Sequence, residues 1–330
     1  MNKENKNGKR MFLNFGYICK VNIDNLNSSE NAGNIIMLKK IQDAKGDYYA
    51  YVSGQALRYY LKETMSELGL AITKIGKDGE YDLGEIKTEG KKRYEDIIEN
   101  KPDLDLFGFM EAGKGSKKMA LRRWSPVKVS PLISIYPWKD SVDMLTRKKE
   151  GQEGGDLVKV EINTLNFMKG SMVISVNEIG GYVDELNYDT KSVVEEKEKI
   201  RRMELLLDAL KNLDGGAKKA RLLDDITPKF LIIAKQKAGT PIFLNSLNVD
   251  ENGELDLDLI QESLCEYTDI IEDYVVGVRS KIFSNEQKIK DKWKNKVKSV
   301  NEAIGITKGW LNTTNKSNND KTEVKNTTQE

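Results

Sequence analysis

The chain has 330 residues, of which 38% are hydrophobic and 32% are charged. This balance predicts one large folded domain with insertions, or two modest domains, with a strongly hydrated surface. Lys and Arg total 53 and Asp and Glu total 52, so nucleic-acid binding would require basic residues clustered on one face. Histidine is absent, which removes the usual general base and the commonest metal ligand. Cys19 and Cys265 are too few for a metal knuckle, and both are expected in the core.

The first part of the chain predicts a strand followed by a helix. Residues 11–23 are rich in aromatic and β-branched residues, which is typical of a strand. A polar, Asn-rich stretch, a short amphipathic piece and a brief extended segment at 48–52 follow. Ser53 is a candidate N-cap for a helix over about 54–68, because apolar residues recur there at helical spacing.

The middle of the chain predicts an insertion and a long hairpin. Residues 69–119 are rich in Gly and Lys and are interpreted as an inserted subdomain. Residues 127–138 predict a strand interrupted by Pro131. A charged segment with glycines at 139–156 then separates this strand from renewed alternation at 157–176, which indicates a hairpin with an exposed tip.

The last predicted elements are a helix over 192–213, a strand over 228–236, a helix over 256–276 and a basic helix around Trp293. Without the insertions, the order is β-α-β-β-α-β, the ferredoxin-like order that RRM modules share. The predicted fold class is therefore α+β. Residues 309–330 are mostly polar and are expected to be disordered.

Two motifs are candidate phosphate sites. Ser53, Gln55 and Arg58 lie at the start of the first helix, where backbone N–H groups favour an anion, although the chemistry alone slightly favours an ordinary capped helix with a surface arginine. The second motif is GGAKKAR at 215–221, whose glycines permit close approach and whose cations meet no acidic residue before Asp224. Glycines that merely end a helix are the alternative.

Other candidates have stronger structural alternatives. Phe167 and Met168 could wedge between bases, but such residues are more often core. The lysines around Trp293 are typical of a solvated helix face. Two carboxylate pairs could bind Mg²⁺ but lack a diagnostic spacing. These pairs are Asp103 with Asp105 and Asp224 with Asp225.

Several segments in order resemble one family. They are GNIIMLKKI, YVSGQALRYYLKE, DLDLFGFM, VSPLIS, VEINTLNFMKGSMVISV and GGAKKARLLDDITPKFLII. Together they resemble the DevR-type CRISPR-associated proteins over about residues 11–235, and most closely the I-B branch. Those proteins are the backbone subunits of type I Cascade.

The resemblance implies a modified RRM palm with helical fingers and a β-hairpin thumb. The implied parts are the palm at 11–68, 120–138 and 157–240, the fingers at 69–119, the thumb at 139–156, a C-terminal helical part at 241–308 and a disordered tail at 309–330.

The resemblance also implies a non-catalytic role without cofactor or metal. Several copies would stack head to tail on one crRNA and contact other Cascade subunits. Target DNA would pair with the guide, and an effector nuclease would be recruited indirectly. No apolar run is long enough to span a membrane, so the expected location is the cytoplasm.

Carried over by position, the implied RNA contacts lie on the first strand, the first helix, the thumb base and the glycine loop. They are Lys20, Ser53, Gln55, Arg58, Lys62, Arg147, Gly215, Gly216, Lys218 and Lys219. Two rival functions stay open. One is RNA cutting by a loop aspartate, Asp24, as in the related type III backbone subunit, and the other is a free RNA- or DNA-binding regulator.

Overall fold

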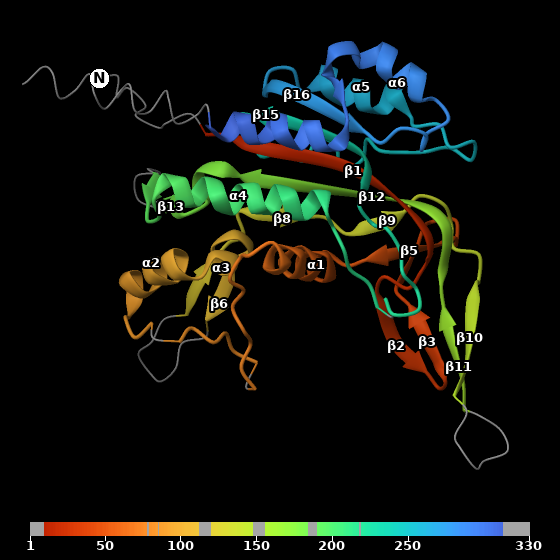
Figure 1. Cartoon of the computed structure of the whole chain (residues 1–330), viewed down its shortest axis with the longest axis horizontal. Coiled ribbons are helices and arrows are strands. Elements are labelled where there is room, and N and C mark those ends of the chain that lie inside the picture. Colours follow the sequence, from red (N-terminus) through yellow and green to blue (C-terminus); the bar gives the residue numbers. More distant parts are fainter. Residues whose placement is uncertain are drawn as a thin grey trace, which may run out of the picture.

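A computed structural model describes residues 10–77, 79–84, 86–111, 120–147, 156–183, 190–217 and 219–312, with the backbone alone at 145–147 and 156–157. A large β-sheet crosses the molecule, and two projections leave its region on the same side (Figure 1). One projection contains helices and the other contains strands, and helix α1 (Gly54–Glu67) lies between them.

The main sheet has the strand order β17-β16-β15-β1-β12-β9-β5-β4, and β8 also pairs with β12. The long strand β1 pairs antiparallel with both β12 and β15, so it forms the centre of the sheet. The strands are β1 (Phe12–Asp24), β4 (Lys40–Gln42), β5 (Tyr48–Val52), β8 (Val127–Val129), β9 (Leu132–Ser134), β12 (Asn163–Ser175), β15 (Pro228–Gln236), β16 (Ile271–Val278) and β17 (Val297–Lys298).

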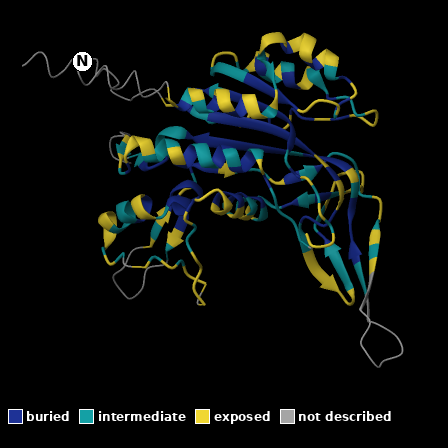
Figure 2. Ribbon diagram, viewed as in Figure 1, coloured by how far each residue is buried: buried dark blue, intermediate teal, exposed yellow. Residues whose placement is uncertain are grey.

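Both faces of the sheet at β1 are covered. Leu13, Phe15 and Tyr17 pack into one buried cluster that includes residues of α1, of α4 (Glu196–Lys211) and of a last helix at 300–312. Ile18 points to the opposite cluster, which includes residues of α5 (Leu257–Glu266) and α6 (Glu286–Trp293). Figure 2 shows that the ribbon of the central strands β1 and β12 is buried over most of its length. The alternation of side chains along β1 therefore serves two cores at once.

The predicted succession of elements is present. β1, α1, β8 with β9, β12, α4 and β15 follow one another in the β-α-β-β-α-β order. β15, β1, β12 and β9 are successive neighbours in the sheet, and α1 contacts α4. The protein is thus a mixed α/β structure in which long antiparallel strands are backed by helices.

The helical projection, here called the α2–α3 lobe, spans residues 71–123. Its elements are α2 (Gly90–Asn100), α3 (Pro102–Phe107), β6 (Phe109–Glu111) and β7 (Leu121–Arg123). Ile97, Leu104 and Phe109 form its own small core. A second small hairpin follows β12 through the turn η1 (Val176–Glu178) and consists of β13 (Gly181–Val183) and β14 (Thr190–Ser192).

The strand projection, here called the side sheet, has the order β10-β11-β3-β2. Its strands are β2 (Ser28–Ala32), β3 (Ile35–Leu38), β10 (Val142–Arg147) and β11 (Asp156–Glu161). β10 and β11 form a hairpin, but β10 lies within the segment 139–156 that the sequence predicts as an exposed tip, whereas the strands at 127–134 pair with β12 instead. Residues 148–155 lie outside the described residues. The sequence did not predict that β11 also pairs with β3, because β2 and β3 fall in and beside the polar, Asn-rich stretch.

One ion pair holds the side sheet to the main sheet. Glu161, at the end of β11, is 7% exposed and accepts hydrogen bonds from the Leu38 backbone N–H and from Lys40 Nζ, both at 2.7 Å. Lys40 Nζ also lies 3.5 Å from the centroid of the Trp138 ring. The carboxylate and the indole face both stabilise the charged ammonium group of Lys40. These contacts fix the end of β11 next to the main sheet.

A buried network holds the α2–α3 lobe to the rest of the molecule. The Asp105 carboxylate is fully buried and accepts hydrogen bonds from Arg123 Nη2 at 2.5 Å, Arg202 Nη1 at 2.9 Å and the Gly180 N–H at 2.9 Å. Arg202 also donates to the last carbonyls of α2, including that of Ile98 at 2.8 Å. The network therefore joins α2, α3, β7 and α4.

Several expectations about the C-terminal part are wrong. The helix expected over 256–276 ends at Glu266, and Ile271–Val278 is strand β16 on the edge of β15. Its β-branched residues also fit a helical spacing, which misled the prediction. The expected disorder is wrong for residues 309–312, which continue the last helix and bury Leu311; the rest of the tail lies outside the described residues. Cys19 is buried as expected, whereas Cys265 is exposed.

We expect Asp105→Asn to lower the free energy of unfolding by about 3–5 kcal/mol, because it leaves the buried Arg123 without a carboxylate and removes one of the two carboxylates that Arg202 contacts. Urea unfolding followed by circular dichroism measures this loss. Asp291→Asn on the exposed side of α6 is the matched control and should change stability by less than about 0.5 kcal/mol. Equal stability of the two variants would contradict the assigned role of the network.

Candidate nucleic-acid interface

The start of α1 is built as a capped helix. Ser53 Oγ accepts the Ala56 N–H at 3.3 Å, and the Ser53 N–H donates to Asn27 Oδ1 at 3.0 Å. Gln55 is exposed in the first turn, and its side chain has no hydrogen-bond partner among the described residues. Ser53 thus supports the helix terminus, and Gln55 presents free donors beside it.

The glycine loop lies against this helix. The Ala217 N–H donates to the Asn25 carbonyl at 3.0 Å, directly after β1. A Cβ atom at Gly215 would overlap the ring of Tyr60 from α1, so only glycine permits the contact. The Tyr60 hydroxyl donates to the Leu26 carbonyl. Tyr60 therefore brings the end of β1, the helix α1 and the glycine loop together.

The charge of the glycine loop differs from the sequence expectation. Lys219 pairs with Asp214, the acidic residue directly before Gly215, and not with an acidic residue after the loop. The side chains of Lys219 and Asp214 are 42% and 43% exposed, so the lysine remains accessible from solvent. Gly216 adopts φ +130°, which favours glycine. Lys218 lies outside the described residues.

Two of the expected phosphate contacts already have protein partners. Arg58 donates to the Phe107 carbonyl, and its guanidinium carbon lies 5.6 Å from the centroid of the Phe107 ring. Burial lowers the pKa of Arg58, a cost that an anion bound beside it would offset. Lys62 Nζ pairs with the buried Asp103 at 2.9 Å. Both cations thus connect α1 to the α2–α3 lobe, and their contact with RNA stays a prediction.

Lys20 is not brought to this surface. It is exposed, pairs across the sheet with Phe167, and its Nζ lies 5.6 Å from the centroid of that ring. Phe167 belongs to the cluster on the face opposite α1, so Lys20 lies on that far face. The wedge hypothesis is wrong for Phe167 and Met168, which are 6% and 1% exposed. Arg147 ends β10, and its side chain is outside the described set.

The carboxylates proposed for Mg²⁺ are used within the protein. Asp103 accepts hydrogen bonds from Lys62 and from Thr73 Oγ1, the latter at 2.6 Å, and Asp105 lies in the arginine network. Asp225 pairs with Lys229 at 2.7 Å, and this lysine and Thr227 lower the pKa of Asp225 to about 2. Over the described part of the chain, no group of three potential ligands could hold a metal ion, and no helix is long and apolar enough to cross a membrane.

Asp24 is the last residue of β1 and not part of a loop, contrary to the expectation for the rival nuclease. It is 1% exposed. Its carboxylate accepts the Leu26 N–H at 3.2 Å and Asn163 Nδ2 at 3.3 Å. Burial, together with the nearby charge of Asp224, raises the pKa of Asp24 to about 7. A proton therefore exchanges at this buried carboxyl near neutral pH.

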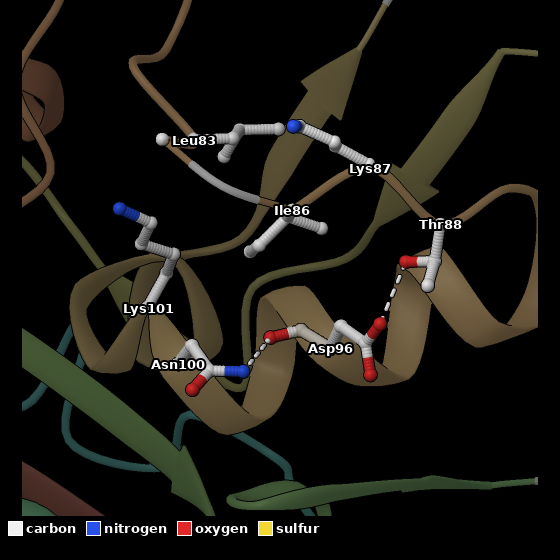
Figure 3. Close-up of a pocket in the computed structure, with 8 residues that line it drawn as sticks. Leu83, Ile86, Lys87, Thr88, Asp96, Asn100 and Lys101 are labelled. Carbon is white, nitrogen blue, oxygen red and sulfur yellow. Dashed lines mark hydrogen bonds between the residues drawn. The ribbon is translucent and has the colours of Figure 1, made fainter.

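The α2–α3 lobe contains an open cavity of about 690 Å³. Figure 3 shows Asn100, Asp96 and Thr88 on and beside α2 on one side, and Leu83 and Lys87 on the other. Thr88 Oγ1 donates to Asp96 at 2.6 Å, and Asn100 Nδ2 donates to the Asp96 carbonyl at 2.9 Å. Thr88, Asp96 and Asn100 thus bond to one another, and none of the expected RNA contacts lines the cavity.

The basic helix at the C-terminus is balanced by acids. Lys290 pairs with Glu286 at 2.6 Å and Lys292 with Asp258 at 2.6 Å. Lys296 pairs with Asp273 at 2.5 Å. The solvated-face alternative therefore fits this segment better than a nucleic-acid patch.

Tyr60, which joins the parts of this surface, is not predictable from the helical pattern of its own segment. Its packing on Gly215 depends on two segments that lie far apart in the chain. The one available signal was the pair of adjacent glycines, which indicates close approach to a neighbour without naming it.

Comparison with known proteins identifies the family. The family described as CRISPR-associated negative auto-regulator DevR/Csa2 matches residues 15–252, and the chain belongs to it. No curated protein matches the chain. Similar solved structures include a chain of a "CRISPR RNA-guided surveillance complex, pre-nicking" with TM-score 0.48, 14% identity and coverage of 82% of this chain and 93% of that one. Another, from a "CRISPR RNA-guided surveillance complex", has TM-score 0.48, 15% identity and coverage of 82% and 90%.

We expect Asp24→Asn to change how stability depends on pH. The folded-state pKa of Asp24 lies above its unfolded value of 3.8, so the folded state binds the extra proton, and stability falls as pH rises towards 7. Between pH 5 and pH 8 the wild type should lose about 2–3 kcal/mol relative to the variant, which cannot ionise. Urea unfolding of both proteins at the two pH values gives this difference, and an equal change in both would refute it.

Proposed function

We propose that the chain is a non-catalytic subunit that binds the guide RNA of a type I CRISPR surveillance complex, of the I-B branch, through the RNA backbone. Membership of a CRISPR-associated family supports this role. The observation that carries it is the packing of Tyr60 against Gly215, with its hydroxyl on Leu26. This packing unites the two motifs expected to bind phosphate on one surface.

The chemistry of this surface suits phosphate and not base edges. The first backbone N–H groups of α1, the free amide of Gln55 and the ammonium group of Lys219 are donors, and a phosphate is acceptor-only. Lys219 would exchange Asp214 for a phosphate, and this exchange needs no particular base. Such contacts would therefore accept any guide sequence.

The proposed parts of the molecule follow from the same assignment. The strands β15, β1, β12 and β9 with α1 and α4 would be an RRM-like palm, the α2–α3 lobe the fingers, and β10 with β11 the thumb. An ordinary RRM binds RNA on its open sheet face. Here buried clusters cover both faces at β1, so we place the RNA on the helix side, between the two projections.

The proposed complex contains further partners. Copies of the chain would stack head to tail along one crRNA, with each thumb reaching a neighbour, and other Cascade subunits would complete the assembly. Target DNA would pair with the guide, and an effector nuclease would join indirectly. We place this assembly in the cytoplasm.

We expect Lys219→Ala and Gln55→Ala each to raise the Kd for guide-length RNA by about tenfold, equally for unrelated sequences, because each removes a phosphate contact. The two should differ in salt dependence. Lys219→Ala removes a charge and should lower the slope of log K against log salt by about 0.7, whereas Gln55→Ala should leave the slope unchanged. Fluorescence anisotropy with the full chain at several salt concentrations measures both.

Lys288→Ala is the matched control, since Lys288 is an exposed lysine of α6 that pairs with Glu254 at 3.1 Å. It should leave RNA affinity unchanged. The proposal fails if Lys219→Ala and Lys288→Ala behave alike, or if affinity depends on the RNA sequence.

The alternative function is RNA cutting by Asp24, as in a type III-like backbone subunit. A carboxyl group with a pKa of about 7 is suited to general base catalysis. Its 1% exposure is the opposing observation. Incubation of the purified chain with end-labelled RNA and Mg²⁺ decides between them: cleavage by the wild type that is lost in Asp24→Asn would establish the alternative.

A further inference from the structure

An exposed tryptophan stands directly after β7. Trp124 is 72% exposed, and the guanidinium carbon of Arg122 lies 3.5 Å from the centroid of the Trp124 ring. Trp138 and Trp293, by comparison, are partly or fully buried. Indole is costly to leave in water, so an open ring covered on one side by a cation indicates a recognition surface.

The pair belongs to one face of the β6–β7 hairpin. Arg122 pairs across the hairpin with Met110, which is 67% exposed. Phe109 and Arg123 point to the buried side, where Arg123 contacts Asp105. Met110, Arg122 and Trp124 thus form an open surface, here called the Trp124 platform.

Within the described residues, no acidic group compensates the positive charge of the platform. Arg122 has no acidic partner among the described residues, whereas the neighbouring Arg123 and the nearby Arg93 are paired with Asp105 and Glu111. A stacked guanidinium keeps its outer N–H groups free for an anion. A polyanion that also has flat rings would match both parts of the platform.

The platform adjoins the surface around α1. Gly108 adopts φ +73°, and a Cβ atom there would lie 2.6 Å from the Arg123 carbonyl oxygen and 2.9 Å from the Ser125 N–H nitrogen. The backbone on both sides of Trp124 is therefore pressed against Gly108. The preceding Phe107 carbonyl accepts the hydrogen bond from Arg58 of α1. Trp124 is thus connected to α1, the helix of the candidate phosphate surface, through Gly108, Phe107 and Arg58.

We propose that the Trp124 platform stacks a nucleobase of the single strand that passes over α1, while Arg122 holds the adjoining phosphate. This inference rests on the proposed function and adds a base-stacking site to its phosphate contacts. The strand is single-stranded nucleic acid, either RNA or DNA, since every base offers a flat π face. Stacking without base-edge hydrogen bonds preserves the indifference to sequence.

The test measures the binding of each protein variant to strands with and without bases. Anisotropy with the full chain measures the Kd for short oligo(U), for oligo(dT) and for an abasic strand of equal length. Trp124→Ala should weaken binding of the base-bearing strand by roughly tenfold and leave the abasic strand unchanged, and Trp124→Phe should retain most of the affinity. Arg122→Gln should weaken both strands, because it removes a phosphate contact. Comparison of oligo(U) with oligo(dT) tells which strand the platform prefers.

Leu259→Ala on α5, which removes another exposed apolar side chain far from the proposed RNA contacts, is the control and should not change binding. The inference is overturned if Trp124→Ala binds both strands like the wild type while Lys219→Ala and Gln55→Ala still weaken binding; the proposed function then stands. It is also overturned if Trp124→Ala changes only self-association in sedimentation, which would make the platform a protein contact. A wild type that binds neither strand refutes both proposals.

Discussion

The carboxylate of Asp105, enclosed by Arg123, Arg202 and the Gly180 N–H, is the constraint on which the arrangement of this molecule depends. A buried charge is stable only when its hydrogen bonds are complete, and here the partners come from three different segments. The α2–α3 lobe has a small core of its own, so its position relative to α1 depends on this network, on Arg58 and Lys62, and on α3 residues such as Phe107 that pack in the main cluster. The network thereby sets the spacing between the candidate phosphate surface around α1 and the Trp124 platform.

Covering both faces of the sheet also decides where a ligand can bind. In a two-layer ferredoxin-like domain one sheet face is open, but β16, α5 and α6 close it here around Phe230 and Phe243. This closure is the reason for proposing the helix side, where α1 lies between the two projections, as the RNA-binding side. The structural role of the C-terminal part is thus to cover this face of the sheet. Its many lysines do not indicate that role.

Local patterns predicted much of the fold. The helix expected over 54–68 is found at Gly54–Glu67, because Leu57, Leu61 and Met65 place their buried side chains at helical spacing regardless of distant partners. The strand expected over 228–236 is found there for a similar reason, as a continuous apolar run. Strand β2 has the polar sequence SSENA and exists only through its pairing with β3. Likewise, Lys62 pairs with Asp103, which lies 41 residues further along the chain, and Lys219 pairs with Asp214 on the other side of the glycines. The sequence identifies the charge of these lysines but does not identify the acids that they contact.

The packing of Gly215 on the ring of Tyr60 links two positions that lie far apart in the sequence. Any side chain at 215 would displace the ring, and loss of the ring would leave the loop without its support. Natural variation within the family is thus restricted: a relative with a smaller residue at the position of Tyr60 has room for a side chain at 215, whereas one that retains the tyrosine does not. The two positions should therefore change together over evolution, and such covariation would reflect the direct contact between them.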